Sequence, residues 1–288
     1  MTNIKNIKEL LEFGIINIDK SSGPTSFNIS DFVRKQLNLR KTSHFGTLDP
    51  KVTGVLPIAL NRACKLTGYF LGEDKEYIGI MRIHEDVSLD KIKKTIKEKF
   101  LGKIKQTPPV KSRVKRQERI REIKKFYILE KDGKNILFHI ECEGGTYIRK
   151  ICSDLGDYMK IGAHMLELRR IRAGIFKEDD KNYPSINLYE FEKAVDEYKK
   201  GNEESLNKII IPGEIITKLH PIIKVKEKEV KRLLTGKPIY KKDLIKEGKM
   251  ETGKIICVFS KAKFIGMYKV INEKEIFAKS EFVMQPIK

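Results

Sequence analysis

The chain contains no tryptophan and only four cysteines in its 288 residues, and it has no long uninterrupted apolar run. Because a membrane-spanning helix needs roughly 18 or more apolar residues, we expect no membrane span. The cysteines are Cys64, Cys142, Cys152 and Cys257, and they form no CxxC pair. His139 lies near Cys142 but has no second thiol at a zinc-site spacing. We therefore expect reduced thiols and no metal site. The first residues lack the apolar core and cleavage site of a secretion signal, which favours a cytoplasmic location.

Acidic residues are also in short supply, since 39 Asp and Glu stand against 59 Lys and Arg and leave a net charge of +20. The excess is spread along the whole chain rather than gathered in one tail. Such a charge suits a long polyanion better than a small acidic metabolite. The alternative is that the lysines only keep the surface solvated. No helix-turn-helix or zinc pattern indicates a DNA-binding protein.

Hydrophobic periodicity predicts short helices and strands in mixed order. Strands are expected at 14–19, 55–60, 77–83, 120–129, 136–142 and 165–171. Helices are expected at 29–37, 63–70, 89–100 and 146–159. The pair Asp132-Gly133 between two of the strands is a favoured hairpin turn. Hairpins between helices favour an α+β fold with a mixed, largely antiparallel sheet over a doubly wound parallel sheet.

The last quarter of the chain has a different pattern from the rest. Residues 187–218 are mostly helical in pattern and are interrupted at Pro212-Gly213, and after Pro221 short strands alternate with glycines. We therefore expect two domains, residues 1–218 and residues 219–288, of which the second is a small β-barrel.

The segment KTSHFGTLDP, residues 41–50, is the most informative part of the chain because it presents a carboxylate on a constrained turn. Gly46 permits a positive φ or a close backbone approach, and Pro50 pushes Asp49 towards an extended conformation. Thr47 offers a hydroxyl to the backbone, and His44 adds a polar ring. Asp49 is therefore either a turn or helix cap or a reacting group, and the local pattern alone favours the cap.

Three further clusters carry polar or basic residues that could serve chemistry. Tyr77 lies on an expected strand between Lys75 and Arg82, and Arg149 follows two glycines at the start of an expected helix, where free N–H groups favour anions. Leu168 precedes two arginines in GAHMLELRR. Each has a structural alternative: a half-buried strand aromatic, a surface or ion-paired helix residue, and a core leucine. The basic run 110–125 is equally compatible with a solvated strand pair.

The four clusters, in this order, resemble the motifs of the TruB/dyskerin superfamily of RNA pseudouridine synthases. The matching segments are HFGTLDP at 44–50, KEY at 75–77, GTYIR at 145–149 and GAHMLELRR at 162–170. The stretches TPPVKSRVKRQ at 107–117 and CEGGTYIRK at 142–150 are more similar to the archaeal and eukaryotic dyskerin branch than to bacterial TruB. In DKSSGPTS, Ser21 stands where the family has a proline. The C-terminal region is similar to a PUA domain, a small RNA-binding barrel.

The resemblance implies that the chain converts uridine to pseudouridine in RNA without a cofactor. The implied substrates are uridine 55 in the TΨC arm of tRNA and guide-directed sites in rRNA. In the second case the chain would work with an H/ACA guide RNA and small protein partners. A non-catalytic RNA-binding scaffold of the same fold is the alternative.

The resemblance also assigns roles to six residues. It implies that the catalytic residues are Asp49, Tyr77 and Arg149, and that the substrate-binding residues are Leu168, His44 and Lys20. Asp49 would be the essential carboxylate, acting as nucleophile or as base at the sugar, with Arg149 keeping it ionised in a desolvated pocket. Tyr77 would stack on the uracil and assist the proton transfer from C5. Leu168 would form an apolar wall, and His44 would support the flipped-out nucleotide.

Overall fold

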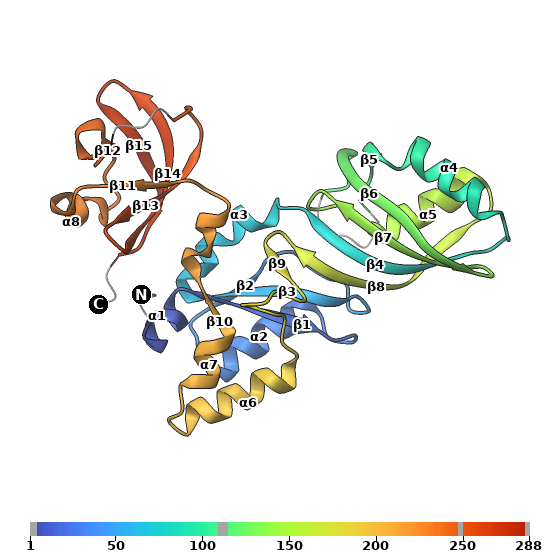
Figure 1. The fold of residues 1–288 in the computed structure, drawn as a ribbon, viewed down its shortest axis with the longest axis horizontal. Helices are drawn as coiled ribbons and strands as arrows, with labels where there is room; N and C mark the ends of the chain where they lie inside the picture. Colours follow the sequence, from blue (N-terminus) through green and yellow to red (C-terminus); the bar gives the residue numbers. More distant parts are fainter. Residues whose placement is uncertain (1–4, 109–114, 247–249, 286–288) are drawn as a thin grey trace. The chain divides into compact units, whose positions relative to one another are not determined.

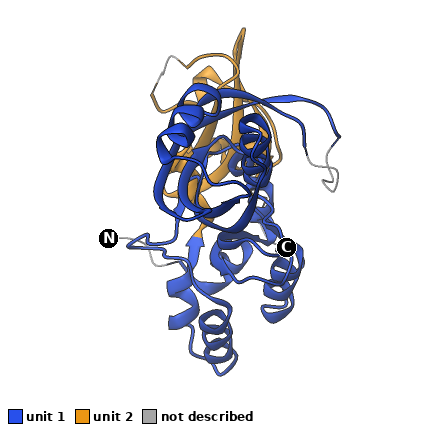
Figure 2. Ribbon diagram, turned by 90° about the vertical axis from the view of Figure 1, so that its right-hand side faces the viewer, with its two compact units in different colours: residues 1–211 blue, residues 212–288 orange. Residues whose placement is uncertain are grey.

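The computed structural model describes residues 5–108, 115–246 and 250–285. It divides into two compact units, residues 1–211 and residues 212–288 (Figure 2). This division lies seven residues before the domain boundary expected from the sequence, because the segment Gly213–Lys218 forms a 3₁₀ turn in the second unit rather than a continuation of the preceding helices. The assignment of a catalytic role to one unit and an RNA-binding role to the other stays a prediction.

The first unit is built on one large mixed sheet (Figure 1). Its strand order is β10-β1-β3-β8-β4-β7-β6-β5, with β2 paired to β3 and β9 to β8. The strands are β1 Gly14–Lys20, β2 Thr42–His44, β3 Thr53–Leu60, β4 Lys75–Ile83, β5 Gly102–Gln106, β6 Arg119–Asp132, β7 Asn135–Cys142, β8 Ala163–Ala173, β9 Phe176–Lys177 and β10 Ile210–Pro212. Across the sheet, in the order β1-β3-β8-β4-β7-β6-β5, neighbouring strands pair antiparallel, except that β3 and β8 pair parallel. The expected α+β fold with a largely antiparallel sheet is confirmed.

Two groups of helices pack on this sheet. The helices α1 Ile7–Glu12, α2 Ser26–Gln36, α6 Leu188–Lys199 and α7 Glu204–Ile209 lie around β1 to β3, whereas α4 Leu89–Lys99 and α5 Ile148–Met159 lie beside β6 and β8 (Figure 1). A short 3₁₀ turn, Asn61–Leu66, leads into α3 Thr67–Leu71 and then into β4. The α2 helix starts with a reciprocal capping box between Thr25 and Asn28, which supplies partners for backbone groups that would otherwise be orphaned. Helix α5 begins at Ile148, two residues later than expected, because Gly145 has φ +84° and Tyr147 is extended.

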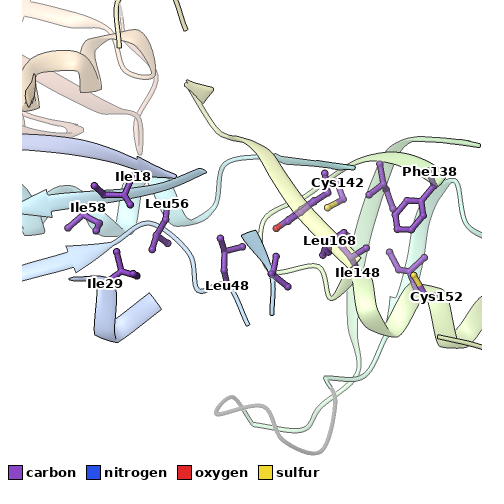
Figure 3. Packing of buried hydrophobic residues seen from close by; sticks show 14 of the residues in the cluster. Ile18, Ile29, Leu48, Leu56, Ile58, Phe138, Cys142, Ile148, Cys152 and Leu168 are labelled. Atoms are coloured by element: carbon purple, nitrogen blue, oxygen red, sulfur yellow. The ribbon is translucent and has the colours of Figure 1, made fainter. Parts of the chain in front are cut away.

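The apolar core of the first unit runs from one helix group to the other. In Figure 3, Leu48 lies between a cluster around Ile18 and Leu56 and a second cluster around Phe138 and Leu168. Along β4 every second residue is buried, from Lys75 through Tyr77 to Ile83, while the alternate residues are more exposed. Since alternate residues of a strand face the same side, Lys75 and Tyr77 share the face that points into this core.

The second unit is a five-stranded sheet with its own core. Its strand order is β11-β13-β14-β15-β12, and β11 with β13 is a parallel pair. The elements are β11 Ile222–Lys224, a 3₁₀ turn Glu227–Glu229, α8 Val230–Leu233, β12 Ile239–Tyr240, a 3₁₀ turn Lys241–Asp243, β13 Ile255–Ser260, β14 Lys263–Glu273 and β15 Ile276–Val283. The buried Tyr268 donates its hydroxyl proton to the Leu233 carbonyl and so ties the sheet to α8. The expected small β-rich unit is confirmed, and its five-stranded sheet is consistent with a PUA-like domain.

Over the described parts of the chain, no helix has both the length and the apolar character needed to cross a bilayer.

Candidate active site

A cavity of about 660 Å³ opens in the first unit where four separate segments meet. It is lined by residues from the loop before β3, from β4, from the start of α5 and from β8. Four of the six residues singled out in the sequence line it, namely Asp49, Tyr77, Arg149 and Leu168. His44 and Lys20 are outside its lining. The basic run 110–125 cannot be placed completely, because its first five residues lie outside the described part of the chain.

The loop that carries Asp49 is held in place by side chains from neighbouring elements. Gly46 has φ +105°, a conformation that a side chain would strain. Ser26, at the start of α2, accepts a hydrogen bond from the Leu48 N–H at 2.8 Å and donates one to the Leu48 carbonyl at 3.0 Å. The Val52 N–H donates to the Asp49 carbonyl at 3.0 Å and closes the turn. The carboxylate of Asp49 is therefore presented on a rigid loop.

Lys20 also stabilises the loop that carries Asp49. Its side chain is fully buried, and its ammonium donates to the carbonyls of Ser21, Pro50 and Val52 at 3.0, 2.9 and 2.7 Å. All three N–H donors are therefore used on backbone carbonyls, and two of these, on Pro50 and Val52, belong to the loop that carries Asp49. Burial is the main cause that lowers the pKa of Lys20, and the Asp49 carboxylate opposes it. Lys20 therefore contacts the loop that carries Asp49 and does not line the cavity.

The Asp49 carboxylate forms an ion pair with Arg149, whose Nη1 lies 3.2 Å from Oδ2. Arg149 is the second residue of α5, and both side chains are about half exposed, at 49% for Arg149 and 47% for Asp49. Solvated pairs of this kind contribute on the order of 1 kcal/mol or less. The desolvated pocket expected for Asp49 is therefore not closed in the free chain, and the pair meets solvent at the mouth of the cavity.

Tyr77 forms the aromatic wall of the cavity, and its buried phenol is hydrogen-bonded to the guanidinium of Arg170. Burial raises the pKa of the Tyr77 phenol, and the Arg170 guanidinium hydrogen-bonded to it lowers that pKa in part. Arg170 itself is 1% exposed and donates from Nε to the Val55 carbonyl at 2.8 Å and from Nη2 to the Gly46 carbonyl at 3.0 Å. One guanidinium thus joins the aromatic wall to both ends of the Asp49 loop.

Arg170 is the residue that the sequence analysis did not single out. The signal was available: Leu168 and Arg170 are two apart on a strand and so share a face. Register pairs Tyr77 with Arg170, and Gly79 with Leu168. A methyl group on Gly79 would come within 2.8 Å of the Leu168 side chain, so the glycine leaves the space that this apolar wall fills.

His44 and Lys75 occupy the edges of the site. The His44 ring is hydrogen-bonded through Nε2 to the Thr47 hydroxyl at 3.1 Å, and burial lowers its pKa. Lys75 lines the cavity, and its ammonium donates to the carbonyls of Phe70, Leu71 and Glu73. Burial, with the neighbouring Arg170 charge, lowers the pKa of Lys75 to about 8. Lys75 therefore fixes the chain that enters β4 just before Tyr77.

The described residues contain no group of three His, Cys, Asp or Glu side chains that could hold a metal ion. The arrangement offers instead an ionisable carboxylate, two guanidinium groups, a phenol and an apolar wall around one cavity. Such a set can bind a flat, partly polar ring and change the covalent state of an atom placed next to the carboxylate.

Comparison with known proteins identifies the family. Residues 34–148 match the TruB family pseudouridylate synthase N-terminal domain, and residues 149–217 match the tRNA pseudouridylate synthase B C-terminal domain. The probable tRNA pseudouridine synthase B of Methanocaldococcus jannaschii is 41% identical over 278 residues, which cover 94% of this chain and 81% of that protein. Its counterpart in Methanopyrus kandleri is 39% identical over 256 residues, covering 88% and 74%.

Solved structures show the same likeness in three dimensions. A chain in the crystal structure of a Cbf5-Nop10-Gar1 complex superposes with a TM-score of 0.87 at 35% identity, covering 98% of this chain and 88% of that one. A chain in an H/ACA ribonucleoprotein bound to a substrate RNA containing 2′-deoxyuridine superposes with a TM-score of 0.86 at 33% identity, covering 98% and 88%.

Fold and sequence together define the class: this is an RNA pseudouridine synthase, an isomerase. Within that class, the chain belongs to the TruB family. The resemblance inferred from the four motifs is confirmed at this level. The catalytic and binding roles of the individual residues stay predictions.

Proposed function

We propose that this chain isomerises uridine to pseudouridine at the cavity between Asp49 and Leu168. The observation that carries the proposal is the Asp49 carboxylate, paired with Arg149 at 3.2 Å and placed beside the wall formed by Tyr77 and Leu168. The family supplies the reaction, and the cavity supplies a place for it on this chain.

The reaction breaks the C1′–N1 bond of uridine, turns the uracil and joins C1′ to C5. The base then loses the proton on C5 and gains one on N1, so atoms balance with no oxidant and no cofactor. The carboxylate of Asp49 serves either by attacking C1′ or by taking a proton from the sugar, and both routes need it ionised. Arg149 pairs with this carboxylate at 3.2 Å.

The remaining lining residues hold the base during its rotation. Tyr77 offers its ring as a stacking surface, and its hydroxyl assists the closing proton transfer. Leu168, on the neighbouring strand β8, adds an apolar surface beside Tyr77. The uridine must leave its helical stack to enter, and the basic character of the chain compensates that cost through contacts with phosphates.

We further propose that the substrates are uridine 55 of tRNA and guide-directed uridines of rRNA. The first follows from relatives named tRNA pseudouridine synthase B, and the second from the likeness to chains in H/ACA particles that contain Nop10 and Gar1. The proposed partners are accordingly an H/ACA guide RNA and small proteins of that kind. The second unit is proposed to bind RNA, and the place of action is the cytoplasm, where these RNAs are available.

Tritium release tests the proposal directly, because formation of the C1′–C5 bond expels the hydrogen on C5. The chain is incubated with tRNA transcript carrying tritium at uracil C5, and in parallel with an rRNA fragment plus guide RNA and small protein partners. Release in either arm supports the enzyme and identifies its substrate. Binding of both RNAs without release in either arm would instead support the non-catalytic scaffold.

A further inference from the structure

Gln106, the last residue of β5, makes a paired contact with the backbone that leads into α5. Its side chain is 3% exposed, and its amide donates from Nε2 to the Tyr147 carbonyl at 3.1 Å. The Tyr147 N–H donates back to Oε1 at 2.8 Å. The amide therefore pairs with both backbone groups of one residue, as a neighbouring strand would do.

Tyr147 stands at the start of a helix, where the first N–H groups have no helical carbonyl to donate to, so its N–H takes a partner from outside α5. It is the N-cap of α5, with φ −97° and ψ 97°, and its side chain makes no capping hydrogen bond. Its carbonyl accepts from the N–H groups of Lys150 at 3.0 Å and Ile151 at 3.1 Å, which form the first turn of the helix. Gln106 thus fixes the residue from which α5 starts.

The segment before Tyr147 contains Gly144 and Gly145, and the backbone of glycine is less restricted than that of other residues. Contacts with neighbouring elements must therefore fix its conformation. One side of it is fixed by close packing, since a side chain on Gly144 would come within 2.5 Å of the Leu71 carbonyl. The other side is fixed by Gln106. Arg149 follows Tyr147 by two residues and reaches Asp49 at 3.2 Å, so a small rotation of the helix start would separate the two charged groups.

We propose that Gln106 is a positioning residue for Arg149, and through it for the chemical step. This inference rests on the proposed function, because it gives Gln106 a role in the same reaction. It differs from a purely structural role, in which the amide would only satisfy buried backbone groups and its loss would lower stability without changing the reaction of the folded protein.

The main variant is Gln106→Leu, which keeps the volume of the side chain and removes both hydrogen bonds. The matched control is Gln36→Leu; Gln36 ends α2, accepts a hydrogen bond from Lys199 at 3.1 Å and does not line the cavity. Single-turnover tritium release and RNA affinity are measured for both, with rates corrected for the fraction of folded protein. We expect Gln106→Leu to slow the single-turnover step by at least about tenfold with Kd changed less than about threefold, and the control to change neither.

A double-mutant cycle separates positioning from a general loss of structure. In an Arg149→Ala background there is no guanidinium left to place, so Gln106→Leu should slow the reaction less than about twofold further. If it slows the reaction as much there as in the wild-type background, or leaves the wild-type rate unchanged, the proposal is wrong.

Gln106→Glu provides a second variant that keeps the shape of the side chain. Burial raises the pKa of the introduced carboxyl, and only its protonated form can donate to the Tyr147 carbonyl. The ratio of variant to wild-type rate should therefore rise as the pH is lowered from about 8 to about 6. A ratio that is flat or falls over this range contradicts the proposal.

Amide hydrogen exchange of the segment from Tyr147 to Ile151 gives a measurement that needs no activity. The clamp is the pair of hydrogen bonds between the Gln106 amide and the Tyr147 backbone. Faster exchange in Gln106→Leu than in the wild type, with unchanged exchange in β1, shows that this clamp holds the start of α5 whether or not RNA is modified. If the wild-type chain releases no tritium, the proposed function fails, while this exchange result still decides whether Gln106 holds the start of α5. Unchanged exchange at this segment would refute the clamp.

Discussion

Arg149 Nη1 and Asp49 Oδ2 lie 3.2 Å apart, although one residue belongs to α5 and the other to the loop before β3. Each side chain is about half exposed, so water screens the pair in the free chain. A bound nucleotide that excludes this water would strengthen the attraction, because the energy of two charges rises as the surrounding dielectric falls. The pair is thus already assembled in the free chain, before any RNA is bound.

Asp49→Asn should stop isomerisation while leaving RNA binding nearly intact. The amide keeps the size of the side chain but removes the charge needed for attack on C1′ or for proton removal. We expect tritium release to fall by at least about a thousandfold, with Kd within about threefold of wild type. Asp31→Asn is the control, because Asp31 pairs with Arg34 and Lys35 on α2 and does not line the cavity. Turnover above a tenth of the wild-type rate would remove Asp49 from its assigned role.

Tyr77→Phe should keep the stacking surface and lose only the hydroxyl. Because burial raises the Tyr77 pKa above its usual 10.0, the hydroxyl stays protonated at neutral and mildly alkaline pH. It can therefore act in the closing step as a proton or hydrogen-bond donor, but not as the base that removes the C5 proton. We expect the single-turnover rate to drop by about 10- to 100-fold with unchanged RNA affinity. Tyr127→Phe serves as the control, since Tyr127 is exposed and stacks on His139. A rate equal to wild type would limit Tyr77 to stacking.

Arg170→Lys should loosen the Asp49 loop and lower stability together. A lysine ammonium cannot reproduce the fork that joins Gly46, Val55 and the Tyr77 phenol, and it leaves buried acceptors without donors. We expect the free energy of unfolding to fall by about 2 to 4 kcal/mol, measured by urea titration, and the single-turnover rate to fall as well. Arg172→Lys is the control, since Arg172 pairs with the carboxylates Glu76 and Glu141. Equal stability losses in both variants would contradict a special role for Arg170.

The sequence was informative where a local rule decides the structure. Gly46 and Pro50 predicted a constrained turn at Asp49, and the alternation in β4 predicted that Tyr77 lies on a strand. The burial of Lys20 and Arg170 could not be predicted in the same way, because charged side chains are rarely buried and are expected at the surface. Their burial depends on carbonyl groups of distant segments, such as Val52 and Val55, which only the folded chain brings within reach.

The type of one helical turn was similarly hidden in the sequence. The segment Gly213–Lys218 has the apolar spacing of a helix but forms a 3₁₀ turn, so the helical pattern extended the expected domain past the observed division after Ile211. Such short turns differ from α-helices in hydrogen bonding rather than in hydrophobic pattern.

Stability should depend on pH through Lys75, whose pKa is lowered to about 8 by burial. In the unfolded chain the ammonium has its usual pKa of 10.5, so between these two values the unfolded state binds more protons than the folded state. The contribution of Lys75 to the free energy of unfolding is therefore constant below pH 8 and increases as the pH rises towards 10.5, by up to about 3 kcal/mol. The measurement is the difference in unfolding free energy between wild type and Lys75→Met across this range. A difference that does not rise with pH would show that the three carbonyls keep the ammonium fully charged.

Removing residues 219–288 should weaken RNA binding and reduce its dependence on salt. This part of the chain is rich in lysine, and each phosphate contact it makes releases counterions when RNA binds. The first unit retains its own core, so a chain of residues 1–218 should keep its helices and its thermal transition, which circular dichroism checks. We expect the slope of log affinity against log salt to become shallower by about 2 to 4. Because the cavity belongs to the first unit, the single-turnover rate at saturating RNA should change much less than the affinity. A salt slope identical to that of the full chain would mean that the C-terminal unit makes no contact with phosphates, and its lysines would then serve only to solvate the surface.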